Sequence, residues 1–137
     1  MPASPPTVLF VCVHNAGRSQ MAAAWLEHLA AGRVQVLSGG STPAAEINPA
    51  AVAAMAEVGI DISARTPQRW TEAGLRSADV VVTMGCGDAC PFYPGKRYKD
   101  WGVADPHGRP IDEVRLIRDD IERRVRGLLG EPGIGPV

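Results

Sequence analysis

The sequence has almost no net charge, no long apolar run and only three cysteines. A formal charge of −1 gives no bulk electrostatic attraction to nucleic acid or to an anionic membrane. No apolar run approaches the roughly 18 residues of a membrane-spanning helix, and the opening MPASPP has neither the basic residue nor the apolar core of a signal peptide. An odd cysteine count, too low for a disulfide scaffold, favours a cytoplasmic protein whose thiols are kept reduced.

The composition is that of one ordinary globular domain, with 45% hydrophobic and 21% charged residues. We expect the domain to cover residues 7–130. Residues 1–6, with three prolines, predict a disordered tail, and the Gly- and Pro-rich residues 131–137 predict a second tail.

Apolar runs rich in β-branched residues alternate with segments of helical spacing. The runs predict strands at 7–13, 33–41 and 78–85 and a short fourth strand at 95–101. Helices are predicted from about Ser19 to Gly32, from an Asn48 cap to Gly59, and from Ile111 to just before Gly130. The charged stretches RDD and ERR predict a solvated face of the last helix. This alternation indicates an α/β fold with a mostly parallel sheet.

A cysteine and an arginine frame the polar loop between the first strand and the first helix. Cys12 ends the strand and Arg18 opens the helix. The free N–H groups and positive dipole of a helix N-terminus bind oxyanions at this edge of a parallel sheet, and Arg18 would hold two oxygens of such an anion. The same positive field favours the thiolate of Cys12, so the loop predicts a nucleophilic cysteine beside a bound anion.

The other loop residues suit a tight turn. Asn15 tolerates left-handed backbone, Ser19 would cap the helix or hydrogen-bond the thiolate, and His14 is expected to be an exposed residue without a chemical role. The structural alternative, a core Cys12 and a surface Arg18, leaves the polar loop unexplained.

The stretch VCVHNAGRSQMA resembles the anion loop of the low-molecular-weight tyrosine phosphatases and of the thioredoxin-coupled arsenate reductases that share their fold. TMGCGDACP and YKDWGVADPHG resemble later motifs of the reductases, so the resemblance covers most of residues 7–129. It implies a single flavodoxin-like α/β domain whose four-stranded parallel sheet is flanked by helices. It also implies a set of oxyanion-binding residues: Val13, His14, Asn15, Ala16, Gly17, Arg18 and Ser19.

By the same resemblance, Asp105 occupies the place of the general acid that protonates a departing oxygen, and Pro106 fixes the turn that presents it. The phosphatases carry aromatic residues after this Asp-Pro pair, as walls for a phosphotyrosine ring. The residues here are His107 and Gly108, which offer no such wall.

The remaining thiols, Cys86 and Cys90, separate a reductase from a phosphatase. A phosphatase needs one thiol, whereas reduction of arsenate takes two electrons, which a dithiol supplies by becoming a disulfide. A zinc site lacks a second ligand pair, and two unconnected structural cysteines remain an alternative. The resemblance implies that Cys86 attacks Cys12 and that Cys90 then attacks Cys86.

The sequence therefore predicts an arsenate reductase recycled by thioredoxin, with phosphate or sulfate as substrate mimics. We expect a monomer without cofactor, metal, nucleic-acid or membrane partner. Many members of the family carry a cysteine where this chain has Gly17. Some reductases carry a glutamate that helps to bind potassium where this chain has Ala23, so we expect no potassium site here. The alternatives are a low-molecular-weight tyrosine phosphatase, a reductase recycled by a low-molecular-weight thiol and a glutaredoxin-like protein, and an oxyanion-binding module without turnover.

Overall fold

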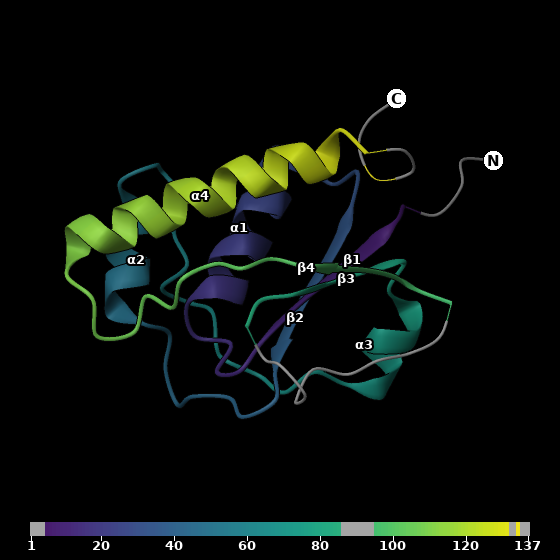
Figure 1. The fold of residues 1–137 in the computed structure, drawn as a ribbon, viewed down its shortest axis with the longest axis horizontal. Helices are drawn as coiled ribbons and strands as arrows, with labels where there is room; N and C mark the ends of the chain where they lie inside the picture. Colours follow the sequence, from purple (N-terminus) through teal and green to yellow (C-terminus); the bar gives the residue numbers. More distant parts are fainter. Residues whose placement is uncertain (1–4, 86–94, 132–133, 135–137) are drawn as a thin grey trace.

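The computed structural model describes residues 5–85, 95–131 and 134. Cys86 and Cys90 lie outside the described residues, as do most residues of the two predicted tails. The elements follow one another along the chain as β1 (Thr7–Cys12), α1 (Arg18–Ala30), β2 (Gln35–Gly40), α2 (Pro49–Ala56), α3 (Glu72–Ser77), β3 (Val80–Thr83), β4 (Arg97–Asp100) and α4 (Ile111–Leu129) (Figure 1).

The four strands form one parallel sheet in the order β2-β1-β3-β4. β1 is central: it pairs along its whole length with β2, with Cys12 opposite Gly40, and on its other side with β3. Helices cover both faces, so the predicted α/β fold with a four-stranded parallel sheet flanked by helices is confirmed. All four carboxyl ends of the strands consequently lie at one edge of the sheet.

Every residue of β1 is buried, as the continuous apolar run predicts. Val8, Phe10 and Cys12 belong to the larger hydrophobic cluster, which α1, α2 and α4 cover. Leu9 and Val11 face a smaller cluster beneath α3. Figure 1 shows α1, α2 and α4 together on one side of the sheet and α3 on the other. A parallel strand packed on both faces cannot shift its register without exposing apolar side chains, and this fixes the position of Cys12.

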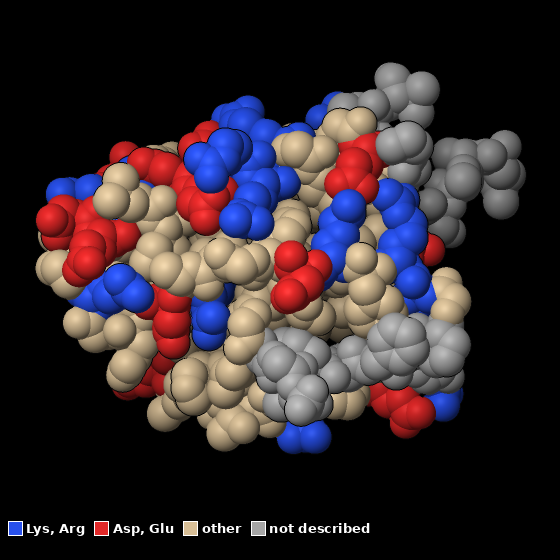
Figure 2. All heavy atoms as spheres, in the orientation of Figure 1, with Lys and Arg blue, Asp and Glu red and all other residues tan. Residues whose placement is uncertain are grey.

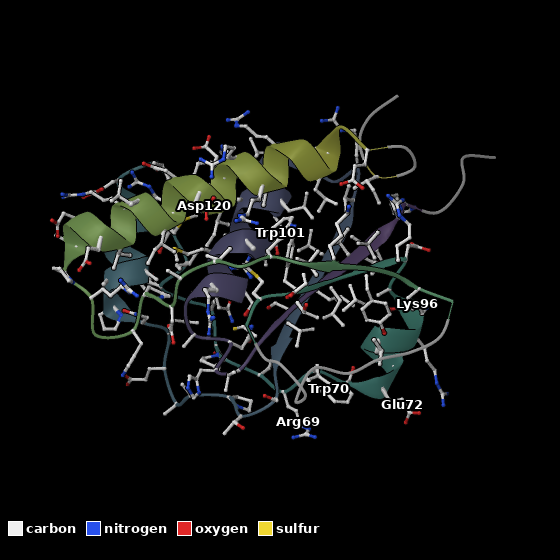
Figure 3. The ribbon with its side chains drawn as sticks, viewed as in Figure 1. Arg69, Trp70, Glu72, Lys96, Trp101 and Asp120 are labelled. Atoms are coloured by element: carbon white, nitrogen blue, oxygen red, sulfur yellow. The ribbon has the colours of Figure 1, made fainter. Side chains whose placement is uncertain are left out.

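Trp101 extends the larger cluster beyond the end of β4. Its ring lies 5.8 Å from that of Phe10, centroid to centroid, and the side chain is 8% exposed. Figure 3 shows it between the sheet and α4. The start of the loop that follows β4 is thereby anchored in the core.

Most helix boundaries follow the predicted signals, but α2 ends at Ala56, three residues before the predicted stop at Gly59, and one helix was not predicted. The Asn48 side chain accepts a hydrogen bond from the N–H of Ala50 at 2.9 Å, and Pro49 opens α2, as predicted. α1 ends at Ala30, just before Gly32, as predicted. The helix that the sequence pattern did not predict is α3, which has six residues.

The longest helix, α4, contains the charged stretches RDD and ERR, for which the sequence predicts a solvated face. Arginines are interspersed with Asp and Glu over its outer surface (Figure 2). The prediction is wrong for Arg118, which is 9% exposed and donates to the Ala54 carbonyl and to Glu57, both at 2.9 Å. Arg118 therefore ties α4 to α2. In the described part of the chain, no helix combines the length and apolar content that crossing a membrane requires.

Two glycines at the end of β2 let other backbone segments approach closely. A Cβ on Gly39 would lie 2.5 Å from Cα of Trp70, and one on Gly40 would lie 2.6 Å from the Val13 carbonyl oxygen. Arg69 lies over the Trp70 ring, 5.4 Å from its centroid; Figure 3 shows both residues at this end of the sheet. The end of β2 is thus enclosed between the segment at 69–70 and the loop after β1.

Candidate active site

The loop between β1 and α1, residues 12–18, lies at the carboxyl edge of the sheet. Four of its carbonyl groups accept backbone hydrogen bonds from the segment 41–48: Cys12 from Ser41 at 3.3 Å, Val13 from Thr42 at 2.8 Å, His14 from Ala44 at 3.0 Å, and Ala16 from Asn48 at 2.8 Å. Within the described residues, the N–H groups of Ala16, Gly17 and Arg18 meet no acceptor. All three residues line a pocket, so their donors are available to an anion.

Asn15 holds this loop from the inside. Its φ of 49° is left-handed, as the sequence predicts for a tight turn at this residue. The side-chain oxygen accepts from the N–H of Gln68 and from the Gln20 amide, both at 2.9 Å. The side-chain nitrogen donates to Ser19 Oγ at 2.7 Å. Because Asn15 is fully buried, these bonds fix both its orientation and the Ser19 hydroxyl.

Cys12 lies at the base of the pocket and is 2% exposed. Its sulfur is 2.8 Å from Ser19 Oγ and accepts from the N–H of Asn15 at 3.2 Å. When the sulfur is ionised, it accepts from the Ser19 hydroxyl, whose oxygen is already occupied by the Asn15 amide. The contact between Ser19 and the Cys12 sulfur that the sequence suggests is present.

Arg18 opens α1 and turns its guanidinium along the wall of the pocket. It is 9% exposed, and Nη2 lies 3.6 Å from Asp105 Oδ2. A Cβ built on Gly85 would lie 2.3 Å from Nη1 of Arg18, and Gly85 has a φ of 84°. The sequence did not identify Gly85 as a residue of the site. Its role is to leave room for the Arg18 guanidinium, and this contact is visible only in the structure.

Asp105 reaches the pocket from the loop between β4 and α4. Its Oδ1 accepts from the N–H of His107 at 3.0 Å, and its carbonyl accepts from Arg109 Nε at 2.7 Å. Its side chain is 48% exposed, so the carboxyl group is accessible from solvent. The predicted turn at Pro106 is present: the N–H of Arg109 donates to the Pro106 carbonyl at 3.1 Å.

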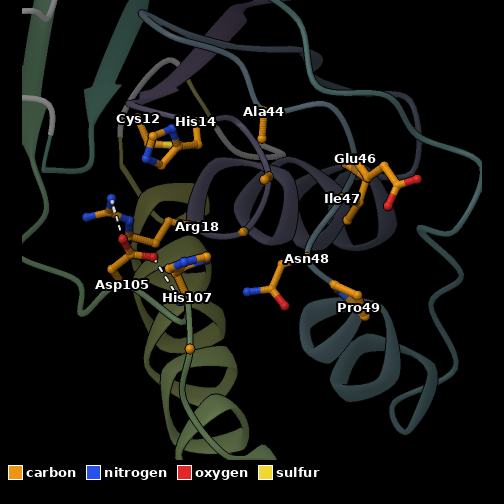
Figure 4. A pocket seen from close by; sticks show the side chains of 13 residues that line it. Cys12, His14, Arg18, Ala44, Glu46, Ile47, Asn48, Pro49, Asp105 and His107 are labelled. Carbon is orange, nitrogen blue, oxygen red and sulfur yellow. Dashed lines mark hydrogen bonds and ion pairs between the residues drawn. The ribbon is translucent and has the colours of Figure 1, made fainter.

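These elements surround a pocket of about 570 Å³. It is lined by Cys12, His14, Ala16, Gly17, Arg18, Ala44, Glu46, Ile47, Asn48, Pro49, Asp105, His107 and Gly108. Figure 4 shows Arg18, Asp105 and His107 on one side and the residues from Glu46 to Pro49 on the other. The wall formed by residues 46–49 could not be predicted from the sequence. These residues belong to a loop and to the start of α2, and they are distant in the chain from Cys12 and from Asp105.

The structure brings together three predicted site residues, Cys12, Arg18 and Asp105. Of the other predicted oxyanion-binding residues, His14, Ala16 and Gly17 line the pocket, whereas Asn15 and Ser19 support Cys12 from behind it and Val13 is not among the lining residues. His14 is exposed, as expected, and its Nδ1 donates to the Thr42 carbonyl at 3.1 Å. Cys86 and Cys90 lie outside the described residues, and their roles stay predictions.

Phosphate or arsenate would meet hydrogen-bond donors in this pocket, namely the Arg18 guanidinium and the backbone N–H groups. The carboxyl group of Asp105 beside Arg18 is placed to exchange a proton with an oxygen of the anion. Among the described residues, no three His, Cys, Asp or Glu side chains are grouped to hold a metal ion. The arrangement suits attack of a thiolate on a tetrahedral oxyanion.

The profile of the low molecular weight phosphotyrosine protein phosphatase family matches residues 7–132. The chain is 42% identical over 126 residues to arsenate reductase 2 of Staphylococcus epidermidis, covering 89% of this chain and 95% of the relative. It is 35% identical over 127 residues to a glutaredoxin arsenate reductase of Synechocystis, covering 90% of this chain and 96% of the relative.

Solved structures give the same picture. A thioredoxin-dependent arsenate reductase of Corynebacterium glutamicum is 48% identical and superposes with a TM-score of 0.80, covering 93% of this chain. The present chain spans 62% of the length of that protein. An arsenate reductase solved in its phosphate-binding state is 35% identical, with a TM-score of 0.80 and coverage of 90% of this chain and 95% of that one.

Proposed function

The chain belongs to the low molecular weight phosphotyrosine protein phosphatase family, and we propose that within this family it is an arsenate reductase, which converts arsenate to arsenite with electrons from thiols. Its similarity to several proteins named arsenate reductases supports this activity. The observation that carries the proposal is the convergence of Cys12, Arg18 and Asp105 on one pocket. Cys12 supplies the nucleophile, Arg18 binds the anion and Asp105 donates a proton.

Arsenate binds in the loop after β1. The N–H groups of Ala16, Gly17 and Arg18 and the Arg18 guanidinium receive its oxygens. A similar arsenate reductase solved in a phosphate-binding state supports binding of a tetrahedral oxyanion by a protein of this fold. These donors recognise the tetrahedral shape and negative charge of an oxyanion. Phosphate and sulfate share both properties and therefore compete with arsenate for the site.

The first chemical step is attack of the Cys12 thiolate on arsenic(V). An As–S bond forms, one As–O bond breaks, and Asp105 donates a proton so that the oxygen leaves as water. The hydrogen bond from Ser19 and the N–H of Asn15 stabilise the thiolate before attack. No electron has been transferred to arsenic at this stage.

Reduction follows when the Cys86 thiolate attacks the Cys12 sulfur. An S–S bond forms, and the electron pair of the As–S bond stays on arsenic, which leaves as arsenite, arsenic(III). Cys90 then attacks Cys86 and releases the Cys12 thiolate, so the oxidised protein carries a Cys86–Cys90 disulfide. A phosphatase of this fold has no use for such a dithiol, because phosphorus(V) does not accept electrons from thiols under these conditions.

We assign thioredoxin as the reductant of that disulfide, acting on the protein as a monomer in the cytoplasm. The similarity to a thioredoxin-dependent reductase favours this assignment. The relative named a glutaredoxin arsenate reductase makes a glutaredoxin-like protein with a low-molecular-weight thiol the competing one. The dithiol of either reductant attacks the Cys86–Cys90 disulfide and becomes oxidised in its place.

The test is arsenite formation by wild type and by the Cys12→Ser, Cys86→Ser and Cys90→Ser variants, each with thioredoxin, its reductase and NADPH. We expect repeated turnover by wild type only. Replacing thioredoxin by glutaredoxin and glutathione identifies the reductant from the same readout. A Cys86→Ser variant that turns over as fast as wild type would contradict the relay.

The same samples distinguish the other functions. Hydrolysis of aryl phosphates without any arsenite would identify a phosphatase, the activity for which the family is named. Tight phosphate binding by a Cys12 that resists alkylation at neutral pH would identify an anion-binding module without turnover.

A further inference from the structure

The ring of Pro106 occupies the space where residue 17 would carry a side chain. A Cβ built on Gly17 would lie 2.6 Å from Cγ of Pro106, 3.4 Å from Cδ and 4.0 Å from Cβ. Carbon atoms in ordinary contact lie about 3.5–4.0 Å apart. The ring therefore fits against the loop after β1 only because Gly17 has no side chain.

This contact anchors the stretch that carries Asp105. From Ala104 to Pro110, every residue is exposed except Pro106. Asp105 and His107 on either side point toward the pocket that Gly17 also lines. The hydrogen bonds of Asp105 to His107 and Arg109 lie within this same turn. They set the shape of the turn but not its distance from the loop after β1.

Within the part of the chain that the structure describes, two contacts relate the Asp105 carboxyl group to the anion site: the packing of Pro106 on Gly17 and the ion pair with Arg18 at 3.6 Å. The ion pair involves a half-exposed carboxylate, and such pairs contribute little to position. The packing contact is buried, and close-packed contacts give way only by moving backbone.

We propose that Gly17 is a positioning residue for the general acid: the missing side chain at residue 17 sets how closely Asp105 approaches an anion held by Arg18. A methyl group there forces the Pro106 ring to retreat by roughly 1 Å to reach ordinary contact. Asp105 moves with it. The catalytic part of this inference rests on the proposed reduction of arsenate, whereas the placement of Asp105 does not.

The variant is Gly17→Ala, and Gly102→Ala is its control. Gly102 lies at the start of the same loop, and among residues 5–85, 95–131 and 134 a Cβ there meets nothing within 4 Å. The double variant Gly17→Ala/Pro106→Ala, compared with Pro106→Ala alone, tests the contact itself. Without Cγ and Cδ, the nearest atom of residue 106 is a Cβ at 4.0 Å from the new methyl group, so the substitution at residue 17 becomes harmless.

Two measurements decide the matter. In crystals of Gly17→Ala, the separation of Asp105 Oδ2 from Arg18 Nη2 should exceed that of wild type and of Gly102→Ala, while the double variant matches Pro106→Ala. In arsenite formation, kcat of Gly17→Ala should fall tenfold or more, on the order expected when a reacting group is misplaced by about 1 Å. KM for arsenate and the affinity for phosphate should stay near the wild-type values.

An unmoved Asp105 in the Gly17→Ala crystal overturns the inference whether or not the protein reduces arsenate. Loss of phosphate affinity that Pro106→Ala does not relieve also overturns it, because residue 17 would then act on the anion loop itself. Absence of arsenite from wild type refutes the proposed function, and the crystallographic comparison still decides whether Gly17 places Asp105.

Discussion

The Ser19 hydroxyl lies 2.8 Å from the Cys12 sulfur at the buried base of the pocket. Ser19 Oγ also accepts from the buried amide of Asn15 at 2.7 Å. The hydroxyl is therefore held with its oxygen occupied and its hydrogen available to a thiolate. A chain of polar side chains behind the loop thus holds the Ser19 hydroxyl against the Cys12 sulfur.

Ser19→Ala should slow alkylation of Cys12 at neutral pH by about tenfold, because a hydrogen bond to a charged group contributes about 1.5–3 kcal/mol. The measurement is the rate of reaction with iodoacetamide in a Cys86→Ser/Cys90→Ser background, where Cys12 is the remaining thiol. Ser63→Ala, which removes an exposed hydroxyl bonded to Asp61, is the control and should react like its parent. Equal rates for the two serine variants would show that Ser19 does not stabilise the thiolate.

Arg18→Lys should weaken phosphate binding at least tenfold, because a lysine ammonium lacks the planar fork that holds two oxygens at once. Isothermal titration with phosphate gives the dissociation constant directly. Arg69→Lys is the control: Arg69 is exposed and donates to the Ser41 carbonyl, but it does not line the pocket. Retention of wild-type affinity by Arg18→Lys would mean that backbone donors alone hold the anion.

Gly85→Ala should also weaken phosphate binding, because the new methyl group would lie 2.3 Å from Arg18 Nη1 and displace the guanidinium. Gly95→Ala is an exacting control. Gly95 has nearly the same φ, 87° against 84° at Gly85, but a Cβ there meets no atom of the described residues within 4 Å. Both substitutions place an alanine at a positive φ, but only Gly85→Ala adds an atom against Arg18 and should lose affinity. Equal affinities in the two variants would contradict the role assigned to Gly85.

Glu57 should make the fold sensitive to acid. Hydrogen bonds from Arg115 and Arg118 lower the pKa of Glu57 from 4.5 to about 2. The carboxylate therefore stabilises the folded state above pH 4.5, and this contribution is lost as the pH falls from there towards 2.

Urea unfolding across that pH range measures the effect. Glu57→Gln should be less stable than wild type at pH 7, and the difference should shrink as the pH falls. The control Glu72→Gln removes an exposed pair with Arg76 and should change stability little at any pH. A Glu57→Gln difference that is independent of pH would contradict this assignment.

The sequence was most informative where local chemistry decides the structure. An unbroken apolar run predicts β1 as a strand buried on both faces, and Asn48 followed by Pro49 predicts the start of α2. The loop of Cys12 and Arg18 could be found because its residues are close together in the chain. The left-handed backbone at Asn15 follows from the same short stretch.

What the sequence could not give depends on long-range packing. α3 has six residues, too few for a helical period to stand out. Arg118 is in a charged stretch typical of a solvated face, yet it is buried because α2 lies against it. The roles of Gly17 and Gly85 depend on which side chains pack against them, and a glycine in the sequence does not show this.

The most direct test of the relay uses a Cys90→Ser variant, fully reduced and mixed with excess arsenate without any other reductant. Peptide mapping by mass spectrometry then identifies the disulfide, while released arsenite is counted per chain. We predict about one arsenite per chain and a Cys12–Cys86 disulfide. Arsenite without a disulfide at Cys12, or a Cys12–Cys86 disulfide that forms equally without arsenate, would contradict the assignment.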